Sequence, residues 1–250
     1  MTAITALVVA RNEAAQLADC LLRLSFADEI VVVLDRTTDE SAAIAQRFGA
    51  HVLEGAWERE GQRRNAGIDA CTGPWIVEVD ADERITAELA AELRYVVAVS
   101  PFAWHELPVD NYVGGHLIRH GWGGSFGKPA YPGLFRKGAK VWGPQRVHPR
   151  LTLDPHKGPR LHNPVEHLVD RNLSDMLRRL DRYTSLRAAD LREAGDAGRL
   201  STNLRRVVTR FWHCYVGRKG YREGGYGLAI AICAALYPLL SHLKATLEDE

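Results

Sequence analysis

Several features that mark common protein classes are missing from this chain of 250 residues. Its four cysteines, Cys20, Cys71, Cys214 and Cys233, are far apart and form no C-x-x-C pair. Scattered thiols favour a reducing, cytosolic setting over a disulfide scaffold or a zinc site. The sequence therefore predicts a cytoplasmic protein.

The sequence also predicts neither a leader nor a membrane-spanning segment. Met1–Ile4 runs directly into an apolar strand without a basic n-region, so we expect no secretory signal. The late apolar stretch Leu228–Leu243 contains Pro238 and is shorter than the roughly 20 apolar residues that a bilayer span needs. No internal repeat and no low-complexity segment is present.

The chain has almost no net charge, +1, but this value conceals an asymmetry. Residues 1–100 carry 9 Lys+Arg and 17 Asp+Glu, a net of −8, and residues 101–250 carry the remaining 23 and 14, a net of +9. The basic part suits contact with phosphate groups or an anionic membrane surface, and it equally suits solvated basic helices.

The first hundred residues alternate apolar runs with segments of helical spacing. The expected strands are Ile4–Ala10, Glu29–Leu34, Gly49–Leu53 and Trp75–Asp80. The expected helices are Ala14–Leu24, Thr38–Phe48, Gly61–Ala70 and Thr86–Val97. This β-α alternation predicts a parallel sheet covered by helices.

Polar side chains follow the ends of three of these strands, at Asn12, Asp35 and Asp80. In parallel sheets, ligands bind beyond the carboxyl ends of the strands. Asp80 and Asp82 are two residues apart, so in an extended segment they would point to the same side. Two carboxylates suit a hard divalent cation, which in turn suits a diphosphate. The sequence therefore predicts a nucleotide-sugar site.

Four motifs in order along the chain carry a resemblance to a known family. They are Val8–Glu13, Val31–Ser41, Gln62–Gly67 and Val79–Glu83. Together they resemble the family 2 glycosyltransferases, which have a GT-A fold. The resemblance implies an α/β, Rossmann-like nucleotide-diphospho-sugar transferase fold with a mostly parallel central sheet and a C-terminal helical extension. It also implies inverting transfer from a nucleoside-diphosphate sugar.

Further segments resemble one subgroup, the lipopolysaccharide core β-glucosyltransferases of the WaaE or KdtX type. They are Leu134–Gly138, Val147-His148, Glu166-His167 and Arg178–Tyr183. This resemblance implies transfer of glucose from a UDP-sugar to a glycolipid such as lipopolysaccharide inner core. Two alternatives stay open: the same donor chemistry on a polyprenyl-linked glycan, natural product or peptide, and a non-catalytic nucleotide-sugar-binding protein.

The family resemblance implies roles for individual residues. The residues expected to bind the donor are Arg11, Asn12, Asp35, Arg64, Asn65 and Asp80. Metal binding falls to Asp82, with His167 as a further metal or diphosphate ligand, and the implied cofactor is Mg²⁺ or Mn²⁺.

The catalytic base is where the sequence departs from its relatives. The subgroup commonly has Val-His-Glu where this chain has Val147-His148-Pro149, so the expected carboxylate is missing. An inverting transfer needs a base that deprotonates the acceptor hydroxyl. Glu166 and His148 are the two leading candidates, and Asp154 is a third.

Three parts are expected along the chain: a donor-binding half over 1–100, an acceptor-side half over 101–172 and a helical extension over 173–250. In the extension, Arg205–Lys244 combines basic, aromatic and apolar residues but contains no RNA- or DNA-binding motif. A peripheral contact with the inner face of the cytoplasmic membrane fits this composition. An apolar face packed on the core or in a homodimer fits it as well.

Overall fold

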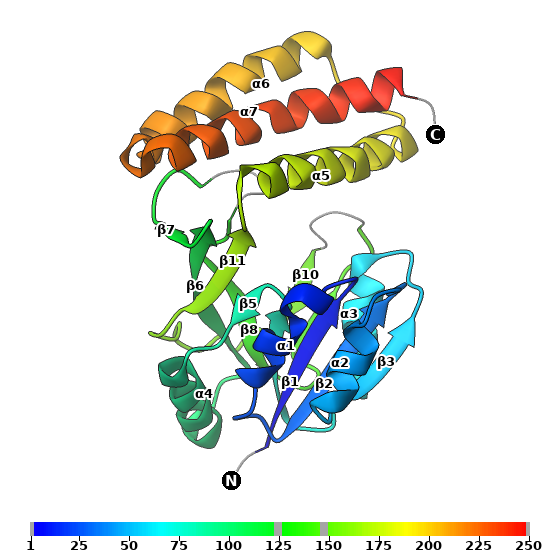
Figure 1. Ribbon diagram of the computed structural model, residues 1–250, viewed down its shortest axis with the longest axis vertical. Helices are drawn as coiled ribbons and strands as arrows, with labels where there is room; N and C mark the ends of the chain where they lie inside the picture. The colour runs from blue at the N-terminus through cyan, green and yellow to red at the C-terminus, as the bar shows by residue number, and fades with distance from the viewer. Residues whose placement is uncertain (1–2, 123–126, 146–149, 249–250) are drawn as a thin grey trace. The chain divides into compact units, whose positions relative to one another are not determined.

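The computed structural model of the protein describes residues 3–122, 127–145 and 150–248, and the chain divides into two compact units (Figure 1). Unit 1 comprises residues 1–109 and 129–167, and unit 2 comprises residues 110–128 and 168–250. The boundaries after Val109 and His167 fall inside two strands, β6 and β11.

Strands and helices alternate through the first hundred residues, as the sequence predicts. The strands there are β1 (Ile4–Ala10), β2 (Glu29–Asp35), β3 (His51–Gly55), β4 (Trp75–Asp80) and the short β5 (Glu83–Arg84). The helices are α1 (Ala14–Leu22), α2 (Ser41–Arg47), α3 (Glu60–Ala70) and α4 (Ala87–Val99). The later strands are β6 (Trp104–Val113), β7 (His116–Ile118), β8 (Ala130–Arg136), β9 (Lys140–Trp142), β10 (Leu151–Leu153) and β11 (Val165–Asp170).

The main sheet has the strand order β3-β2-β1-β4-β8-β6-β11-β5, with β7 on β6, and β9 pairs with β10 apart from it. Strands β1 to β4 pair in parallel. Antiparallel pairing joins β8 to β4, β6 to β8 and β5 to β11. The α/β class is therefore confirmed, but the sheet is mixed, and the expectation of a mostly parallel sheet holds only for its first four strands.

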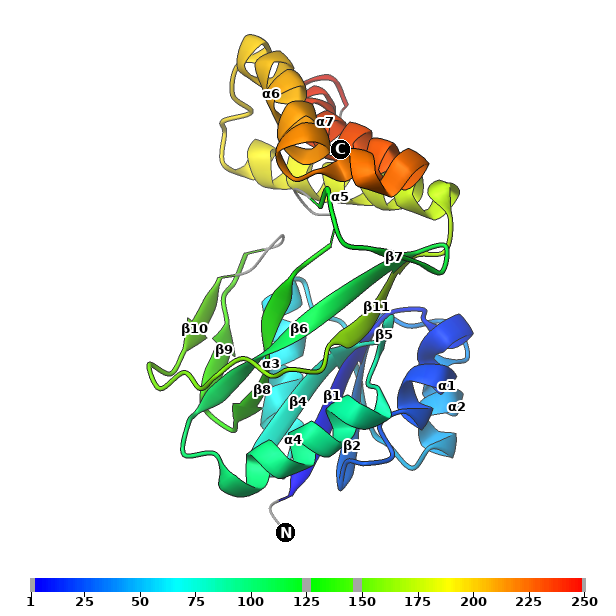
Figure 2. The same cartoon turned by 90° about the vertical axis from the view of Figure 1, so that its left-hand side faces the viewer.

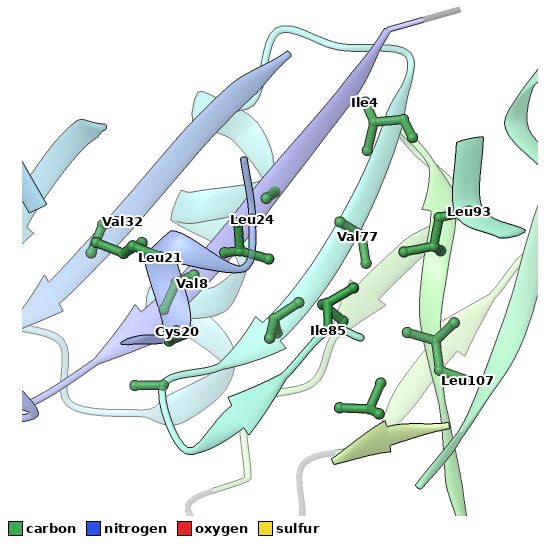
Figure 3. Packing of buried hydrophobic residues seen from close by; sticks show 14 of the residues in the cluster. Ile4, Val8, Cys20, Leu21, Leu24, Val32, Val77, Ile85, Leu93 and Leu107 are labelled. Atoms are coloured by element: carbon green, nitrogen blue, oxygen red, sulfur yellow. The ribbon is translucent and has the colours of Figure 1, made fainter. Parts of the chain in front are cut away.

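The central position of β1 explains its composition, because all seven of its residues are buried. Ile4 and Val8 face one apolar cluster together with α1 and α4, as Figure 3 shows. Leu7 and Val9 face a second cluster that includes Ile68 of α3. Residues that alternate along the strand thus fill both faces of the sheet. Burial of each Val or Leu contributes about 1.5–3 kcal/mol.

The register of the parallel strands brings their carboxyl ends to one edge of the sheet (Figure 2). Val9 of β1 pairs with Val33 of β2 and with Asp80 of β4. Strand β2 ends two residues later, at Asp35. The edge expected to carry the polar residues is therefore formed as the sequence predicts.

Unit 2 contains three long helices, α5 (Leu173–Glu193), α6 (Leu200–Trp212) and α7 (Gly224–Leu247). A π-helical turn (His213–Gly217) and a 3₁₀ turn (Gly220–Glu223) precede α7. Helix α5 is capped by Asn172, whose side-chain oxygen accepts a hydrogen bond from the Asp175 backbone N–H at 2.9 Å. Helix α7 packs against both α5 and α6 (Figures 1 and 2).

The packing of α7 on two neighbours accounts for its apolar sequence. Its buried residues recur with helical spacing: Gly227, Ile230, Ala231, Cys233, Ala234, Ala235, Pro238, Ser241 and His242. Pro238 is accommodated inside the helix. The apolar segment is therefore, in large part, core of unit 2.

The length of this segment differs from the sequence expectation. The helical stretch Gly220–Leu247 has 28 residues, and a window of 18 residues within it has a mean hydropathy of 1.6, so the stretch is long and apolar enough to cross a membrane by those two criteria. The expectation that Leu228–Leu243 is too short was wrong, because the helix continues beyond both ends and through Pro238. Half of its most apolar window is buried within the protein, as in a core helix, so the length alone does not indicate a span.

Candidate functional site

Two loops at the carboxyl edge of the sheet are tied together by Asn12. Its Oδ1 accepts hydrogen bonds from the Thr38 backbone N–H at 2.8 Å and from the Thr38 hydroxyl at 3.4 Å. Asn12 and Arg36 both have positive φ values, 56° and 49°, which are uncommon outside glycine. Such conformations cluster at functional sites. Arg11, the other residue expected in this loop, is exposed beside Asn12.

Asp35 lies at the end of β2 with only 4% of its surface exposed. Its Oδ1 accepts a hydrogen bond from the Trp57 backbone N–H at 3.0 Å and lies 3.3 Å from Arg36 Nη1. Its Oδ2 lies 3.3 Å from Arg63 Nη1. The carboxylate therefore joins three segments at the sheet edge: the loop after β2, the loop after β3 and helix α3.

Arg64 is surrounded by three carboxylates. Its guanidinium contacts Glu60 at 2.9 Å, Glu78 at 2.6 Å and Asp80 at 2.9 Å. Burial alone would lower the pKa of Arg64, but the charges of Asp80, Glu78 and Glu60 outweigh burial and raise this pKa well above its usual value. Arg64 therefore carries a fixed positive charge at the end of β4.

A second cation reaches Glu78 from β9. Lys140 Nζ lies 2.6 Å from Glu78 Oε2, and both side chains are almost completely buried, at 1% and 2% exposed. Trp142 Nε1 also donates to Glu78 Oε2, at 3.3 Å, and the Arg64 guanidinium lies 4.8 Å from the centre of the Trp142 ring. Burial raises the pKa of Glu78, but Lys140 and Arg64 outweigh this effect and hold it below its usual value.

The side chain of Asn65, which was expected to bind the donor, contacts the backbone of Trp142. Its Nδ2 donates to the Trp142 carbonyl and its Oδ1 accepts from the Trp142 N–H, both at 2.9 Å. This pair of bonds attaches β9 to helix α3.

The two carboxylates of the Asp80–Asp82 motif have different neighbours. Strand β4 ends at Asp80, and Ala81 and Asp82 form a turn, so the alternation expected of an extended segment does not reach Asp82. Asp80 contacts Arg64, whereas Asp82 Oδ2 lies 3.4 Å from His167 Nε2 of β11. The structure therefore brings Asp82 and His167 together, the two residues expected to bind metal.

The turn that holds Asp82 is fixed on both sides. Arg84 Nη1 donates to the Ala81 carbonyl at 2.9 Å and to the Glu83 carbonyl at 2.8 Å. Glu83 Oε2 accepts from the Asp80 N–H at 3.1 Å and from the Tyr131 hydroxyl at 2.7 Å. Asp82 remains 32% exposed at its side chain, so it can reach a ligand from a rigid backbone.

The two leading candidates for the base differ in how far the structure describes them. Glu166 precedes His167 in β11 and pairs with Arg84 of β5, and adjacent residues of a strand point to opposite faces. Glu166 is half-buried, on the face of β11 opposite His167. His148 lies outside the described residues. Asp154, the third candidate, bonds through Oδ1 to the exposed His156 ring at 2.8 Å.

Asp82 and His167 together suit a divalent cation that also binds substrate phosphates. Among residues 3–122, 127–145 and 150–248, no group of three or more His, Cys, Asp or Glu side chains could hold a metal ion alone. Mg²⁺ commonly uses one or two protein carboxylates and completes its shell with phosphate oxygens and water. The separation of 3.4 Å between the two donor atoms fits such a partial site.

Sequence reasoning missed several residues of this edge. Arg63, beside the expected Arg64, is the arginine of α3 that reaches Asp35, and Glu78 and Lys140 form a buried ion pair. The motif Gln62–Gly67 contains both arginines. Adjacent residues of a helix point about 100° apart, so the spacing indicates that the two arginines contact different partners. A glutamate within the apolar run of β4 was the available signal for a buried partner.

Gly61 allows α3 to approach β9, and its replacement by alanine should destabilise the protein. A Cβ there would lie 2.0 Å from the Gly143 carbonyl oxygen, which is backbone and cannot rotate away. We expect Gly61→Ala to lower the free energy of unfolding by about 1–3 kcal/mol in urea denaturation. Gly225→Ala, in the first turn of α7 with open space around it, is the control and should be neutral or slightly stabilising. Equal changes in the free energy of unfolding for Gly61→Ala and Gly225→Ala would contradict the close approach of α3 to β9.

Comparison with known proteins agrees with this geometry. Residues 5–127 match the family model described as Glycosyl transferase family 2. An uncharacterized glycosyltransferase of Rickettsia felis is 33% identical over 99 residues, which cover 39% of this chain and 35% of that protein. The match thus spans about a third of the length of this relative and of its counterparts in other Rickettsia species.

Two longer similarities have lower identity. The lipopolysaccharide core biosynthesis glycosyltransferase LpsC of Rhizobium meliloti is 23% identical over 254 residues, covering 96% of this chain and 91% of LpsC. The solved structure of S. aureus TarS 1-349 is 12% identical with a TM-score of 0.47, covering 76% of this chain and 66% of that one. The match of the family model confirms the resemblance of the motifs: residues 5–127, about half of the chain, are similar to the family 2 glycosyltransferases.

Proposed function

We propose that the protein is an inverting glycosyltransferase that moves a sugar, glucose, from a UDP-sugar to a glycolipid such as lipopolysaccharide inner core. The observation that carries the proposal is the contact of Asp82 with His167 at 3.4 Å, at the carboxyl edge of the sheet that also holds Asp35. The similarity to LpsC over 96% of the chain supports a lipopolysaccharide-type acceptor. The reaction would take place in the cytoplasm.

The donor nucleotide would lie along the edge formed by Asn12, Asp35 and Asp80. In the described chain, Nε of Arg63 and Oγ1 of Thr37 are buried without a hydrogen-bond partner. Buried polar groups without partners cost about 1–3 kcal/mol each, so a bound nucleotide or water that satisfies them is favoured. Asp35 would bind the base or ribose, and Asp80, held by Arg64, would contact the ribose or donor sugar.

Asp82 and His167 would hold Mg²⁺ or Mn²⁺ against the diphosphate. Such an ion neutralises the negative charge that develops on the leaving diphosphate. The positive charge of Arg64 lies against Glu60, Glu78 and Asp80. It therefore offsets part of the repulsion between the carboxylates of β4 and the diphosphate. The acceptor proton would go to Glu166 or His148, the two candidates that the sequence leaves open.

Binding of UDP should depend on Asp35. We expect Asp35→Asn to weaken UDP binding by roughly tenfold or more, because the charge-assisted contact is lost while Asn can still accept the Trp57 N–H. Isothermal titration calorimetry with UDP and Mn²⁺ measures this effect. Asp69→Asn, an exposed position on α3, is the matched control and should bind as wild type does. Equal affinity of the Asp35 variant would contradict the donor site.

A turnover assay separates the enzyme from a non-catalytic nucleotide-sugar-binding protein. Both bind UDP with Mn²⁺, but only the enzyme releases UDP from UDP-glucose in the presence of an acceptor. Assays with lipopolysaccharide inner core, polyprenyl-linked glycans and peptides distinguish the acceptors. UDP binding without turnover on any of them would favour the binding protein.

A further inference from the structure

Helix α6 of unit 2 exposes a line of large apolar side chains. Leu200, Leu204, Val208 and Trp212 follow one another at intervals of four residues, and they are 46%, 50%, 70% and 65% exposed. Residues four apart lie on neighbouring turns of a helix and form a continuous stripe. We call these four residues the α6 stripe. Singly exposed apolar residues are ordinary, but a contiguous row marks an interaction surface.

The α6 stripe is not needed to hold unit 2 together. A different face of α6 packs inward, where Asn203 is 4% exposed and Phe211 packs against the apolar cluster shared with α7. Cys214, in the turn that follows, belongs to the same cluster. Helix α6 therefore has two apolar sides, of which the fold uses one.

Positive charge is concentrated in the segment that carries the stripe. Residues 199–222 contain seven basic residues and no Asp or Glu: Arg199, Arg205, Arg206, Arg210, Arg218, Lys219 and Arg222. All except the half-buried Arg210 are exposed. In the described part of the chain, none of the seven forms an ion pair with a carboxylate. Of the basic residues at or within α6, Arg205 follows Leu204 and lies beside the stripe on the helix surface. An apolar row in a segment whose cations pair with no carboxylate suits a helix that lies in the interface of an anionic membrane.

We propose that α6 docks on the surface of an anionic lipid bilayer, with the α6 stripe among the headgroups and Arg205 and the basic residues that follow the helix near lipid phosphates. The proposal rests on the proposed function in one respect, since a glycolipid acceptor would be presented at such a surface. It narrows the sequence expectation that Arg205–Lys244 makes the contact, because much of the apolar part of that segment, in α7, is buried in unit 2.

Charge favours a membrane over a second copy of the chain. A symmetric dimer built on α6 would bring the same patch of both subunits together, because the interface of a twofold dimer is self-complementary. Arg205 and the other cations near this patch would then approach their counterparts in the second copy, and like-charge contacts of this kind oppose association. Anionic lipids supply the opposite sign, and the exposed Trp212 suits the interface between headgroups and acyl chains.

Vesicle sedimentation of the full chain tests the proposal. Wild type should bind phosphatidylcholine vesicles that contain phosphatidylglycerol, bind pure phosphatidylcholine far more weakly, and be released by high salt. Arg205→Glu should weaken binding by roughly tenfold or more, because one cation becomes an anion. Arg47→Glu, on exposed α2 of unit 1, is its matched control and should bind as wild type does.

The apolar contribution needs a second pair of variants. Trp212→Ser should also weaken vesicle binding by roughly tenfold, whereas Tyr95→Ser, which removes an aromatic side chain that is 68% exposed on α4, should not. Calorimetry with UDP and Mn²⁺ should give wild-type affinity for all four variants.

Three results would overturn the inference: no binding of wild type to anionic vesicles, equal loss in the control variants, or a dimer in light scattering that Trp212→Ser dissociates. The last result would make the stripe a subunit interface. Retained UDP binding without vesicle binding defeats only the membrane contact. Vesicle binding without UDP binding or turnover defeats only the proposed enzyme.

Discussion

Replacing Asp82 with asparagine should reduce sugar transfer by roughly 10²–10³-fold or more, the range expected when a group that stabilises developing charge is removed. Asn keeps the size of the side chain but lacks the negative charge that a hard cation requires. The Asp82 side chain is 32% exposed, and its turn is fixed by Arg84 through backbone carbonyls, so the fold should survive. Release of UDP from UDP-glucose at saturating Mn²⁺ measures the effect.

The dependence on metal concentration identifies the cause. If Asp82 and His167 hold the cation together, His167→Ala should raise the Mn²⁺ concentration needed for half-maximal turnover, and Asp82→Asn should raise it further. Asp69→Asn on α3 should leave both turnover and metal dependence unchanged. Wild-type turnover in Asp82→Asn would remove the metal role from this residue, and an unchanged Mn²⁺ requirement in His167→Ala would restrict the role to Asp82.

Most of unit 1 could be predicted from the sequence, because its signals are local. An apolar run such as Ile4–Ala10 predicts a strand buried on both faces. The break at Gly73-Pro74 predicts that a new strand, β4, begins directly after it. The antiparallel strands were harder to predict. Strand β8 pairs with β4, which lies more than fifty residues earlier, and the sequence of neither strand states the direction of its partner.

Residues at the site were harder to predict than the strands that carry them. A lysine in a three-residue strand suggests a solvent-exposed position, yet Lys140 is buried because its partner Glu78 is 62 residues away in sequence. The contact of Asn65 with Trp142 could not be predicted for the same reason, since it joins residues 77 apart. Motifs give residue types at strand ends, and long-range pairing decides which of them remain available to a ligand.

Replacing Lys140 with methionine should lower the free energy of unfolding by about 3 kcal/mol at neutral pH, the lower end of the range for breaking a buried ion pair. Glu78 would stay buried with its charge opposed only by Arg64, whose guanidinium Asp80 and Glu60 share. Methionine keeps roughly the length of the lysine side chain, but it also loses the contacts of the ammonium group with the rings of Phe135 and Trp142. Urea denaturation at several pH values measures the loss.

The pH dependence of this loss distinguishes charge from packing. The folded-state pKa of Glu78 is lowered from its usual value of 4.5, so its contribution to stability is fully present above that pH and is lost as the pH falls through the folded-state pKa. In Lys140→Met, the folded-state pKa of Glu78 should therefore be lowered much less than in wild type. The stability difference between wild type and Lys140→Met should therefore be largest above pH 4.5 and narrow at more acidic pH. A difference that stays constant with pH would indicate lost packing alone.

The double variant Glu78→Gln/Lys140→Met completes the test. The glutamine side chain would carry no charge and could still accept from Arg64, so the double variant should be more stable than Lys140→Met alone at neutral pH, even though it differs from wild type at two buried positions. The same comparison connects the ion pair to the site, because Glu78 and Asp80 share the Arg64 guanidinium. If Lys140 orients Asp80 through this network, UDP affinity should fall in Lys140→Met and recover partly in the double variant. Recovery of stability without recovery of UDP affinity would confine the role of the buried pair to folding.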